Sequence, residues 1–312
     1  MDRRIFEEEH EMFRDSVRSF MTNEIRPHSE RWHEQGIVDR EAYLKAGEMG
    51  LLLMWADEKY GGIGVRDFRY EQVLIEENAH YGDPGFFMTL HSRLVGPYFD
   101  SFATEEQKLR WLPKCITGEH ILAIAITEPG AGSDVAGLRT RAEDKGDHFL
   151  LNGSKTYISN GINADLVIVV ARTDSASKHG FSLFVVERGM EGFERGKNLK
   201  KIGLKSQDTA ELFFNNVKVG KENLLGELHR GFYHLMHGLA EERLLGACGY
   251  IASAEAAYNL TLEYVNERKA FGKLIADFQN TRFKLADMRT EIDVGYAFVD
   301  RCVEEHNEGR LT

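Results

Sequence analysis

The stretch TEPGAGSD, residues 127–134, decides how the middle of this chain is interpreted. It continues the apolar run ILAIAIT, residues 121–127, without a break, so it predicts a loop at the end of a β-strand. Gly130, Gly132 and their small neighbours allow backbone N–H groups to approach an anion such as a pyrophosphate. On spacing alone, the stretch fits a tight turn between strands at least as well.

The loop matches neither of two familiar nucleotide-binding patterns. The third glycine of the Rossmann fingerprint is misplaced, and β-structure rather than a helix is expected to follow the loop. The Gly-Lys-Ser/Thr ending of a Walker A loop is absent at the required spacing. An anion-binding loop and a tight turn therefore both stay open.

Short β-rich runs surround the loop over residues 120–226. The runs are residues 121–127, 166–171, 181–187 and 211–217. Turn signals at Lys145-Gly146-Asp147 and Asn152-Gly153 are expected between strands. Because no stretch here has a convincing helical period, we expect a compact β-barrel or sandwich.

A helical region, residues 1–119, precedes the β-region. Apolar residues at helical spacing run from Ile5 to Ile25, and Pro27 ends that helix. Thr104 is expected to cap the last helix of the region, with Gln107 closing a capping box. The further helices are predicted at residues 41–53, 69–79 and 105–112.

A second helical region follows, residues 227–312. No proline occurs after Pro129, so long helices are predicted at residues 232–268 and 278–305. Two long helices with exposed apolar faces do not complete a bundle, so we expect this helical domain to be incomplete. The fold class is therefore α+β multidomain: an N-terminal helical domain, a middle β-barrel or sandwich domain, and a C-terminal helical bundle.

Composition excludes several classes of function. A net charge of −11 over 312 residues argues against non-specific nucleic-acid binding, which needs a basic surface. Cys115, Cys248 and Cys302 form no disulfide or metal pattern and are expected to be free thiols in a reducing compartment. No apolar run is long enough to span a membrane. The histidines lack ligand-like spacing, so no metal is predicted.

Five motifs together resemble the acyl-CoA dehydrogenase family. They are AITEPGAGSD (125–134), LNGSK (151–155), YISNG (157–161), EKYGG (58–62) and RKAFGK (268–273). The resemblance covers essentially the whole chain in the family's order and is closest to the long-chain and isovaleryl-type branch. It implies a flavin enzyme that oxidises an acyl-CoA to the trans-2-enoyl-CoA and passes electrons to an electron-transfer flavoprotein.

The resemblance also implies where FAD would bind. The implied contacts are Ile124, Ala125, Ile126, Thr127, Gly132, Ser133, Tyr157, Ile158, Ser159, Arg268, Phe271 and Gln279. Thr127 would contact the flavin ring, Gly132 and Ser133 would meet the pyrophosphate, and Ser159 would hydrogen-bond flavin N5. Arg268 and Phe271 would reach the FAD of a neighbouring subunit, so a homo-oligomer, as a tetramer or dimer, is implied.

Two adjacent glutamates compete for the role of the base that removes the α-proton. Helical spacing places Glu242 on an apolar face with Leu235, Leu239, Gly246 and Gly249. The same spacing places Glu241 with His234 and His237, on what is expected to be a solvated edge. Without the family, a surface acid paired with a cation would be the simpler interpretation of Glu242. In the long-chain and isovaleryl branch, the base is the Glu directly before an Arg, which matches Glu242 and Arg243.

Substrate contacts follow from the same resemblance. Ser133, Lys178 and His179 would approach the CoA moiety, although a plain solvated role suits His179 equally well. The residues that would flank the acyl thioester are Tyr233, Ala240, Glu241 and Arg243. Two alternatives keep the fold: an acyl-CoA oxidase or flavin monooxygenase that reacts with oxygen, and a non-catalytic relative. The expected location is the cytoplasm of a bacterium or the mitochondrial matrix of a eukaryote.

Overall fold

The computed structural model describes residues 3–312, which form two compact units. The first unit takes the N-terminal residues through Pro27, then Asp67–Asp83 and Ala240–Thr312. The second unit takes His28–Arg66 and Pro84–Leu239. The N-terminal helical region of the sequence is thus divided between both units. The domain boundaries after residues 119 and 226 stay a prediction.

The helices of the second unit lie in its N-terminal part. They are α2 (Ser29–Gln35), α3 (Arg40–Glu48), η3 (Glu58–Tyr60), η4 (Leu90–Val95), α5 (Gly96–Phe102) and α6 (Glu105–Ile116). The capping box of α6 is confirmed: Thr104 N–H donates to Gln107 Oε1 at 2.9 Å, and Gln107 N–H donates to Thr104 Oγ1 at 3.3 Å. The helix predicted at residues 41–53 ends at Glu48, because Gly50 and Leu53 have φ of 69° and 45°.

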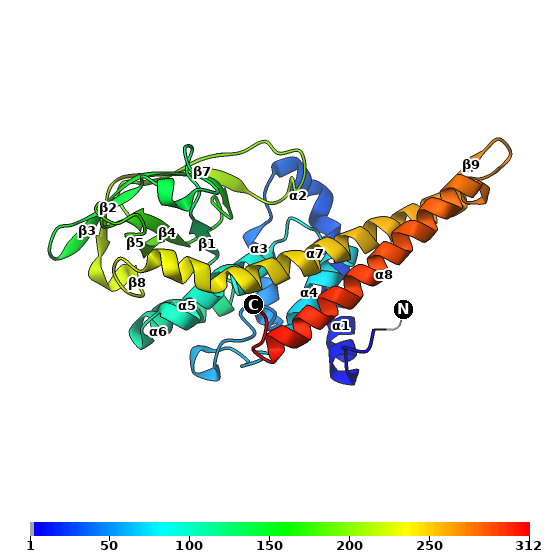
Figure 1. Cartoon of the computed structure of the whole chain (residues 1–312), viewed down its shortest axis with the longest axis horizontal. Coiled ribbons are helices and arrows are strands. Elements are labelled where there is room, and N and C mark those ends of the chain that lie inside the picture. The colour runs from blue at the N-terminus through cyan, green and yellow to red at the C-terminus, as the bar shows by residue number, and fades with distance from the viewer. Residues whose placement is uncertain (1–2) are drawn as a thin grey trace. The chain divides into compact units, whose positions relative to one another are not determined.

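An eight-stranded sheet fills the rest of this unit (Figure 1). Its strands are β1 (Leu122–Ala125), β2 (Arg141–Asp144), β3 (His148–Ser159), β4 (Leu166–Arg172), β5 (Phe181–Glu187), β6 (Phe193–Asn198), β7 (Thr209–Gly220) and β8 (Leu224–Leu225), with the 3₁₀ turns η5 (Val135–Gly137) and η6 (Lys221–Asn223). The order is β6-β7-β3-β2-β4-β5-β8, with β1 parallel to β4. All four predicted β-runs are strands. Over residues 3–312 no pairing joins β6 to β8, so the sheet is not closed into a barrel.

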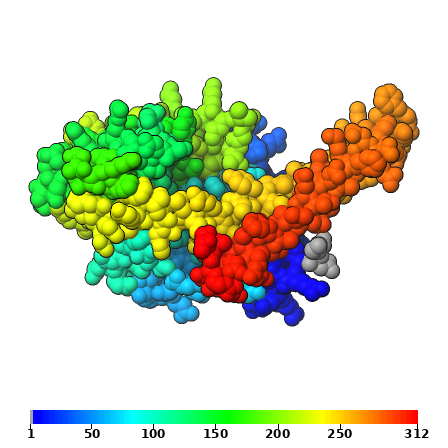
Figure 2. Space-filling model, in the orientation of Figure 1, coloured from blue at the N-terminus to red at the C-terminus, as the bar shows by residue number. Residues whose placement is uncertain are grey.

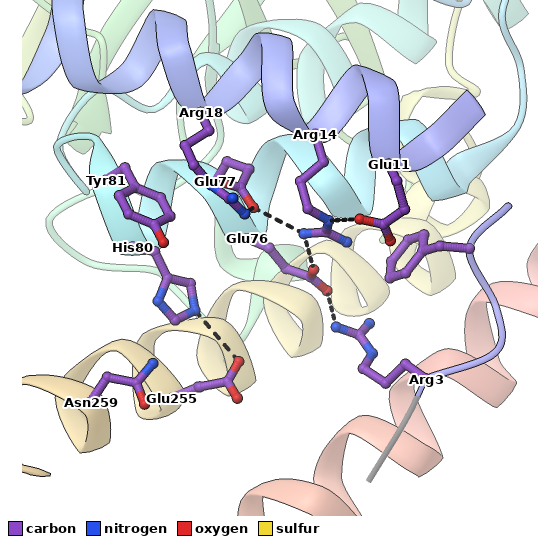
Figure 3. A pocket seen from close by; sticks show the side chains of 11 residues that line it. Arg3, Glu11, Arg14, Arg18, Glu76, Glu77, His80, Tyr81, Glu255 and Asn259 are labelled. Carbon is purple, nitrogen blue, oxygen red and sulfur yellow. Dashed lines mark hydrogen bonds and ion pairs between the residues drawn. The ribbon is translucent and has the colours of Figure 1, made fainter. Parts of the chain in front are cut away.

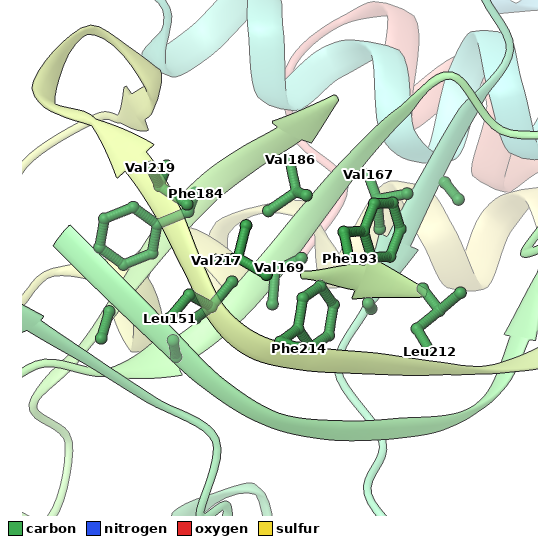
Figure 4. Close-up of a cluster of buried hydrophobic side chains, with 14 of the residues drawn as sticks. Leu151, Val167, Val169, Phe184, Val186, Phe193, Leu212, Phe214, Val217 and Val219 are labelled. Atoms are coloured by element: carbon green, nitrogen blue, oxygen red, sulfur yellow. The ribbon is translucent and has the colours of Figure 1, made fainter. Parts of the chain in front are cut away.

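Both halves of the sheet bury side chains in one apolar core (Figure 4). Phe184 and Val186 of β5 meet Leu212 and Phe214 of β7 in the same cluster. The cluster also holds Phe193, whose ring stacks on that of Phe214 at 5.2 Å. Because strands far apart in the sheet order share this core, the sheet must curl over it, as the sandwich alternative expects.

One of the two predicted turns is wrong. Lys145-Gly146-Asp147 does connect β2 and β3: Lys145 N–H donates to His148 O at 2.8 Å, and Gly146 has φ of 95°. Asn152-Gly153 instead lies inside β3, where the register with β7 shifts between Leu151 and Gly153. The glycine serves close packing there, since a Cβ on Gly153 would lie 2.5 Å from Thr140 Oγ1.

The first unit is helical. Its elements are α1 (Glu8–Phe20), η1 (Met21–Ile25), α4 (Phe68–Tyr81), most of α7 (Gly231–Glu267), β9 (Lys269–Ala270), β10 (Lys273–Leu274), η7 (Ile275–Asp277) and α8 (Gln279–Asn307), with η2 (Arg26–His28) at its edge. The long helices α7 and α8 begin and end within two residues of their predicted bounds. No helix of residues 3–312 has the length and apolar character needed to cross a membrane.

Helices α7 and α8 lie side by side, and the β9–β10 turn joins them (Figures 1 and 2). Arg289 of α8 donates to Glu255 of α7 at 2.7 Å. The two helices pack closely at Gly295, where an added Cβ would lie 2.5 Å from Ile251 Cδ1. The β9–β10 turn (orange in Figure 2) extends beyond α1 and α4 of the same unit.

Candidate active site

The loop after β1 combines a tight turn with an open surface. Glu128 N–H donates to Ala131 O at 2.9 Å, and Ala131 N–H donates to Glu128 O at 3.1 Å. Beyond this turn, Gly132 and Ser133 are exposed. A Cβ added to Gly130 would meet no atom within 4 Å. The loop is therefore a tight turn that leaves room for a ligand against its backbone.

The side chains before this turn face in different directions. Ala125 is fully buried in the apolar core of the sheet, so it can face a ligand only through its backbone. Ile124, Ile126 and Thr127 are half-buried. These three side chains can therefore line a binding surface, as predicted for a cofactor site.

The end of β3 carries an unusual aromatic residue. Tyr157 has φ of 58° and a side chain that is 69% exposed. It lies where the register between β3 and β7 shifts, between Lys155 and Ile158. A bulge of this kind turns one side chain out of the regular alternation of a strand. Tyr157 therefore presents its ring to solvent, whereas Ile158 points into the core and Ser159 is half-buried.

Hydrogen bonds hold the loop and the end of β3 together. Thr156 N–H donates to Thr127 O at 2.9 Å. The side-chain amide of Asn160 donates to Leu122 O at 3.1 Å. The predicted flavin segments, residues 124–133 and 157–159, are thus brought side by side within one unit.

A buried ion pair, not predicted from the sequence, lies directly behind these segments. Lys155 Nζ donates to Glu128 Oε1 and to Ile126 O, each at 2.8 Å. The Glu128 carboxylate also accepts from the N–H groups of Arg139 at 2.7 Å and Thr140 at 2.9 Å. Burial lowers the pKa of Lys155 to about 8, although Glu128 opposes that shift. Burial alone would raise the pKa of Glu128, but Lys155 and the N–H donors hold that pKa below its usual value.

The predicted CoA contacts Lys178 and His179 lie in the loop before β5, and the predicted thioester contact Tyr233 lies at the start of α7. His179 is not a plain solvated residue, because its ring stacks on Phe232 at 4.1 Å and 14°. Its neighbour Lys178 is exposed. Tyr233 is 49% exposed and has its ring edge-on to His179 at 6.4 Å. The structure therefore brings His179 and Tyr233 together at the start of α7.

Arg172 connects the loop of Lys178 to the segment that follows Ser133. Its guanidinium donates to Ala136 O at 2.8 Å and to Ser177 O at 2.9 Å. Sequence reasoning missed this role, because an arginine at the end of β4 is usually a solvated residue. Arg172 therefore holds together the segment after Ser133 and the loop that contains Lys178, which are both next to predicted substrate contacts.

The competing glutamates of α7 belong to the first unit. Glu242 is half-buried, and Leu235 and Leu245, about two turns before it and one turn after it, are buried. Glu241 is also half-buried: its Oε2 lies 3.4 Å from His306 Nε2, and its side chain is 24% exposed. The expectation of a solvated edge for Glu241 is therefore wrong, because α8 covers it. The neighbour Ala240 is half-buried and Arg243 is exposed.

The three remaining predicted cofactor residues gather around the β9–β10 turn. Arg268 and Gln279 are exposed, and Phe271 is 96% exposed with φ of 51°. An aromatic side chain held almost entirely in solvent by a left-handed backbone contributes little to packing among residues 3–312. Its position suits a contact with another molecule.

Comparisons with known proteins identify the family of this chain. Residues 7–119, 123–217 and 229–312 match the N-terminal, middle and C-terminal domains of acyl-CoA dehydrogenases. The long-chain specific acyl-CoA dehydrogenase of Rattus norvegicus is 48% identical over 99% of this chain and 72% of the rat protein. The chain belongs to the acyl-CoA dehydrogenase family.

Solved structures of acyl-CoA dehydrogenases share the fold. The enzyme from Geobacillus kaustophilus superposes with a TM-score of 0.96 at 50% identity, covering 99% of this chain and 82% of that one. The FAD complex of an acyl-CoA dehydrogenase from Bacillus anthracis has a TM-score of 0.89 at 34% identity, covering 96% of this chain and 51% of that one. The fold expected from the sequence, helical, sheet and helical domains, is confirmed.

Proposed function

We propose that this chain is an FAD-dependent acyl-CoA dehydrogenase that forms the trans-2-enoyl-CoA, with Glu242 as the acceptor of the α-proton. Family membership makes it an oxidoreductase of acyl-CoA thioesters. The observation that supports the finer assignment is the pairing of the loop after β1 with the end of β3. Thr156, next to the exposed Tyr157, donates to Thr127 O at 2.9 Å, and exposed Gly132 and Ser133 follow Thr127 in the same loop.

These residues fit FAD in shape and chemistry. The exposed Tyr157 ring and the half-buried Ile126 and Thr127 offer a partly apolar surface for a flat ring. The open backbone at Gly132 and Ser133 suits a pyrophosphate. When bound, FAD would supply the hydride acceptor at flavin N5. The Ser159 hydroxyl would donate a hydrogen bond there.

Glu242 is proposed to take the proton from the α-carbon of the thioester. A carboxylate becomes a stronger base when it is partly removed from water. The half-buried position of Glu242 on α7, between buried leucines of the same helix, supports that role. Glu241 is the poorer candidate, because its carboxylate lies against His306.

The CoA part of the substrate is proposed to lie along Ser133, Lys178 and His179. Exposed Lys178 would neutralise phosphate charge, and the stacked rings of His179 and Phe232 would offer a flat surface. Tyr233, Ala240, Glu241 and Arg243 are proposed to flank the acyl thioester.

Two macromolecular partners are part of the proposal: an electron-transfer flavoprotein that accepts the electrons, and further copies of this chain, as a tetramer. Exposed Phe271 supports self-association, since its ring is 96% exposed among residues 3–312. Arg268 and Gln279 beside it are proposed to complete the FAD site of a neighbouring copy.

A visible spectrum of the full-length protein tests the cofactor and the substrate class. We expect oxidised flavin absorption that bleaches anaerobically when acyl-CoAs of increasing chain length are added. Stopped-flow mixing of the reduced, product-bound protein with air should show slow reoxidation. Rapid reoxidation would instead identify an oxygen-reacting oxidase. Flavin that no acyl-CoA reduces would contradict the proposal.

Replacing Glu242 by Gln tests the base. The variant should keep FAD but lose on the order of 10²–10⁴-fold in the rate of flavin bleaching, the usual contribution of a positioned base. Glu263→Gln, at an exposed site on the same helix, is the matched control and should bleach at the wild-type rate. Wild-type bleaching in Glu242→Gln would refute the assignment.

A further inference from the structure

The buried pair of Lys155 and Glu128 requires an explanation beyond packing. The Lys155 side chain is 0% exposed and that of Glu128 is 7% exposed. Charges removed from water are costly unless they are paired and hydrogen-bonded, and an apolar pair of similar volume is often at least as stable. A pair retained at this position is therefore better explained by the geometry that it imposes.

The acceptors of Lys155 show what it orders. One is Ile126 O, which directly precedes Thr127, and the other is the carboxylate of Glu128, which directly follows it. Lys155 thus donates hydrogen bonds to the residues on both sides of Thr127. Since Lys155 also precedes the bulge that turns Tyr157 outward, a single side chain links both predicted flavin segments.

Hydrogen bonds rather than packing fix Glu128 in place. A hollow of about 260 Å³ borders Glu128, Gly130, Thr140 and Gly153, so the loop has no dense core on that side. The carboxylate is oriented instead by Lys155 and by two backbone N–H groups. Loss of the ammonium would remove the hydrogen bonds to Ile126 O and Glu128 Oε1 and so loosen the loop on the side of the hollow.

We infer that Lys155 and Glu128 are positioning residues that hold Thr127 and Tyr157 in the relative positions needed for flavin binding. This inference rests on the proposed function, because it assumes that the two segments contact FAD. The pair touches neither substrate nor reacting atoms in the proposal. It acts through the backbone of the loop and of β3.

Three variants of the full-length protein test the inference: Lys155→Met, Glu128→Gln and the double variant. Lys221→Met is the matched control, since it removes an exposed ion pair between Lys221 of η6 and Asp144 of β2. The measurements are the FAD dissociation constant, the visible spectrum and reduction potential of the bound flavin, and the thermal midpoint.

Each single variant should bind FAD on the order of tenfold more weakly or worse, while Lys221→Met should match wild type. Lys155→Met should also lower the flavin reduction potential, because it leaves the Glu128 carboxylate uncompensated. The double variant, which is uncharged, should recover the potential but not the FAD affinity. A purely structural pair would not produce this charge-dependent pattern.

A lower thermal midpoint with unchanged FAD affinity, spectrum and potential would overturn the inference and leave the proposed function intact. If the single variants do not fold, the double variant decides: wild-type FAD affinity in a folded double variant overturns the inference. A wild-type protein that takes up no FAD would instead overturn the proposed function, and the inference with it.

Discussion

The two units bury different large side chains beside their common aliphatic residues. In the sheet of the second unit, large apolar side chains are inside: Phe149 and Phe184 are 1% and 0% exposed. In the first unit, the carboxylates of Glu76 and Glu77 are inside. The large apolar side chain of Phe298, on α8, is 71% exposed.

Arginines form ion pairs with the buried carboxylates of the helical unit (Figure 3). Arg14 Nη1 lies 2.8 Å from Glu76 Oε2 and 3.0 Å from Glu77 Oε1. Arg3 contacts Glu76 at 2.7 Å, and Arg18 contacts Glu77 at 2.9 Å. Burial raises the pKa of Glu76 even though Arg3 and Arg14 oppose the shift. These groups line a hollow of about 430 Å³.

The difference teaches what stabilises each unit. The sheet gains its stability mainly from apolar area removed from water in its buried cluster. The helical unit also buries apolar side chains, and it adds paired charges to them. Its outer apolar faces suit a cover by a second copy, as the proposed oligomer requires. Mutations of buried apolar residues and of paired charges should therefore show which interaction stabilises each unit.

The largest effect is expected for Phe184→Ala in the sheet core. Loss of the buried ring should lower the free energy of unfolding by about 3–5 kcal/mol, through lost transfer energy and a new cavity. Phe213→Ala is the control, because its ring on β7 is 40% exposed. Urea denaturation would measure both. Equal decreases in the free energy of unfolding for the two variants would show that the sheet core is not the main source of stability of this unit.

A somewhat smaller loss is expected for Glu77→Gln in the helical unit. The variant loses the charged hydrogen bonds from Arg14 and Arg18, while Arg14 keeps its contact with Glu76, so the cost should be about 1.5–3 kcal/mol. Glu11→Gln breaks a more exposed contact of the same Arg14 and should cost less than about 0.5 kcal/mol. If Glu77→Gln is as stable as wild type, charge pairing does not hold these helices together.

Glu255→Gln should have a smaller, pH-dependent effect. Hydrogen bonds from His80 and Arg289 lower the pKa of Glu255 from 4.5 to about 2. Because the folded pKa lies below the unfolded one, this stabilisation is present above pH 4.5 and is lost as the pH falls toward 2.

Urea midpoints at several pH values would measure this effect. Glu255→Gln should be less stable than wild type by about 1 kcal/mol at pH 7, and the difference should vanish near pH 2. Glu304→Gln, at an exposed pair with Arg301, is the control and should differ little at any pH. A difference that does not change with pH would count against the ionic origin.

The smallest effect on folding is expected for Phe298→Ser on the exposed face of α8. Its free energy of unfolding should stay within about 0.5 kcal/mol of wild type, the usual range for surface changes. Light scattering should instead show weaker self-association, since Val294 and Phe298 are exposed one turn apart. Unchanged association would remove this face from the proposed interface.

Local signals in the sequence predicted much of the fold. Strand β5 matches its predicted run at both ends, and the capping box of α6 is present as expected. The absence of proline after Pro129 predicted the long helices. The pattern failed at Asn152-Gly153, because a glycine signals a permissive backbone in a bulge as well as in a turn.

The residues of the candidate site could be predicted from the sequence, but the orientations of their side chains could not. The motifs named Tyr157 and Ile158 alike, yet the bulge turns Tyr157 outward and leaves Ile158 in the core. Lys155 and Glu128 were visible in the sequence as charges next to apolar runs. Their pairing could not be inferred, since it depends on two segments 27 residues apart.

By itself, the sequence determined the element types, the motifs and the family resemblance, because these depend on neighbours along the chain. Tertiary structure alone decided which α7 glutamate lies against His306, which aromatic ring stays in solvent, and how α1 and α4 join the C-terminal helices. These features arise from contacts between distant segments. Each contact orders a long stretch of chain, so no local pattern specifies it.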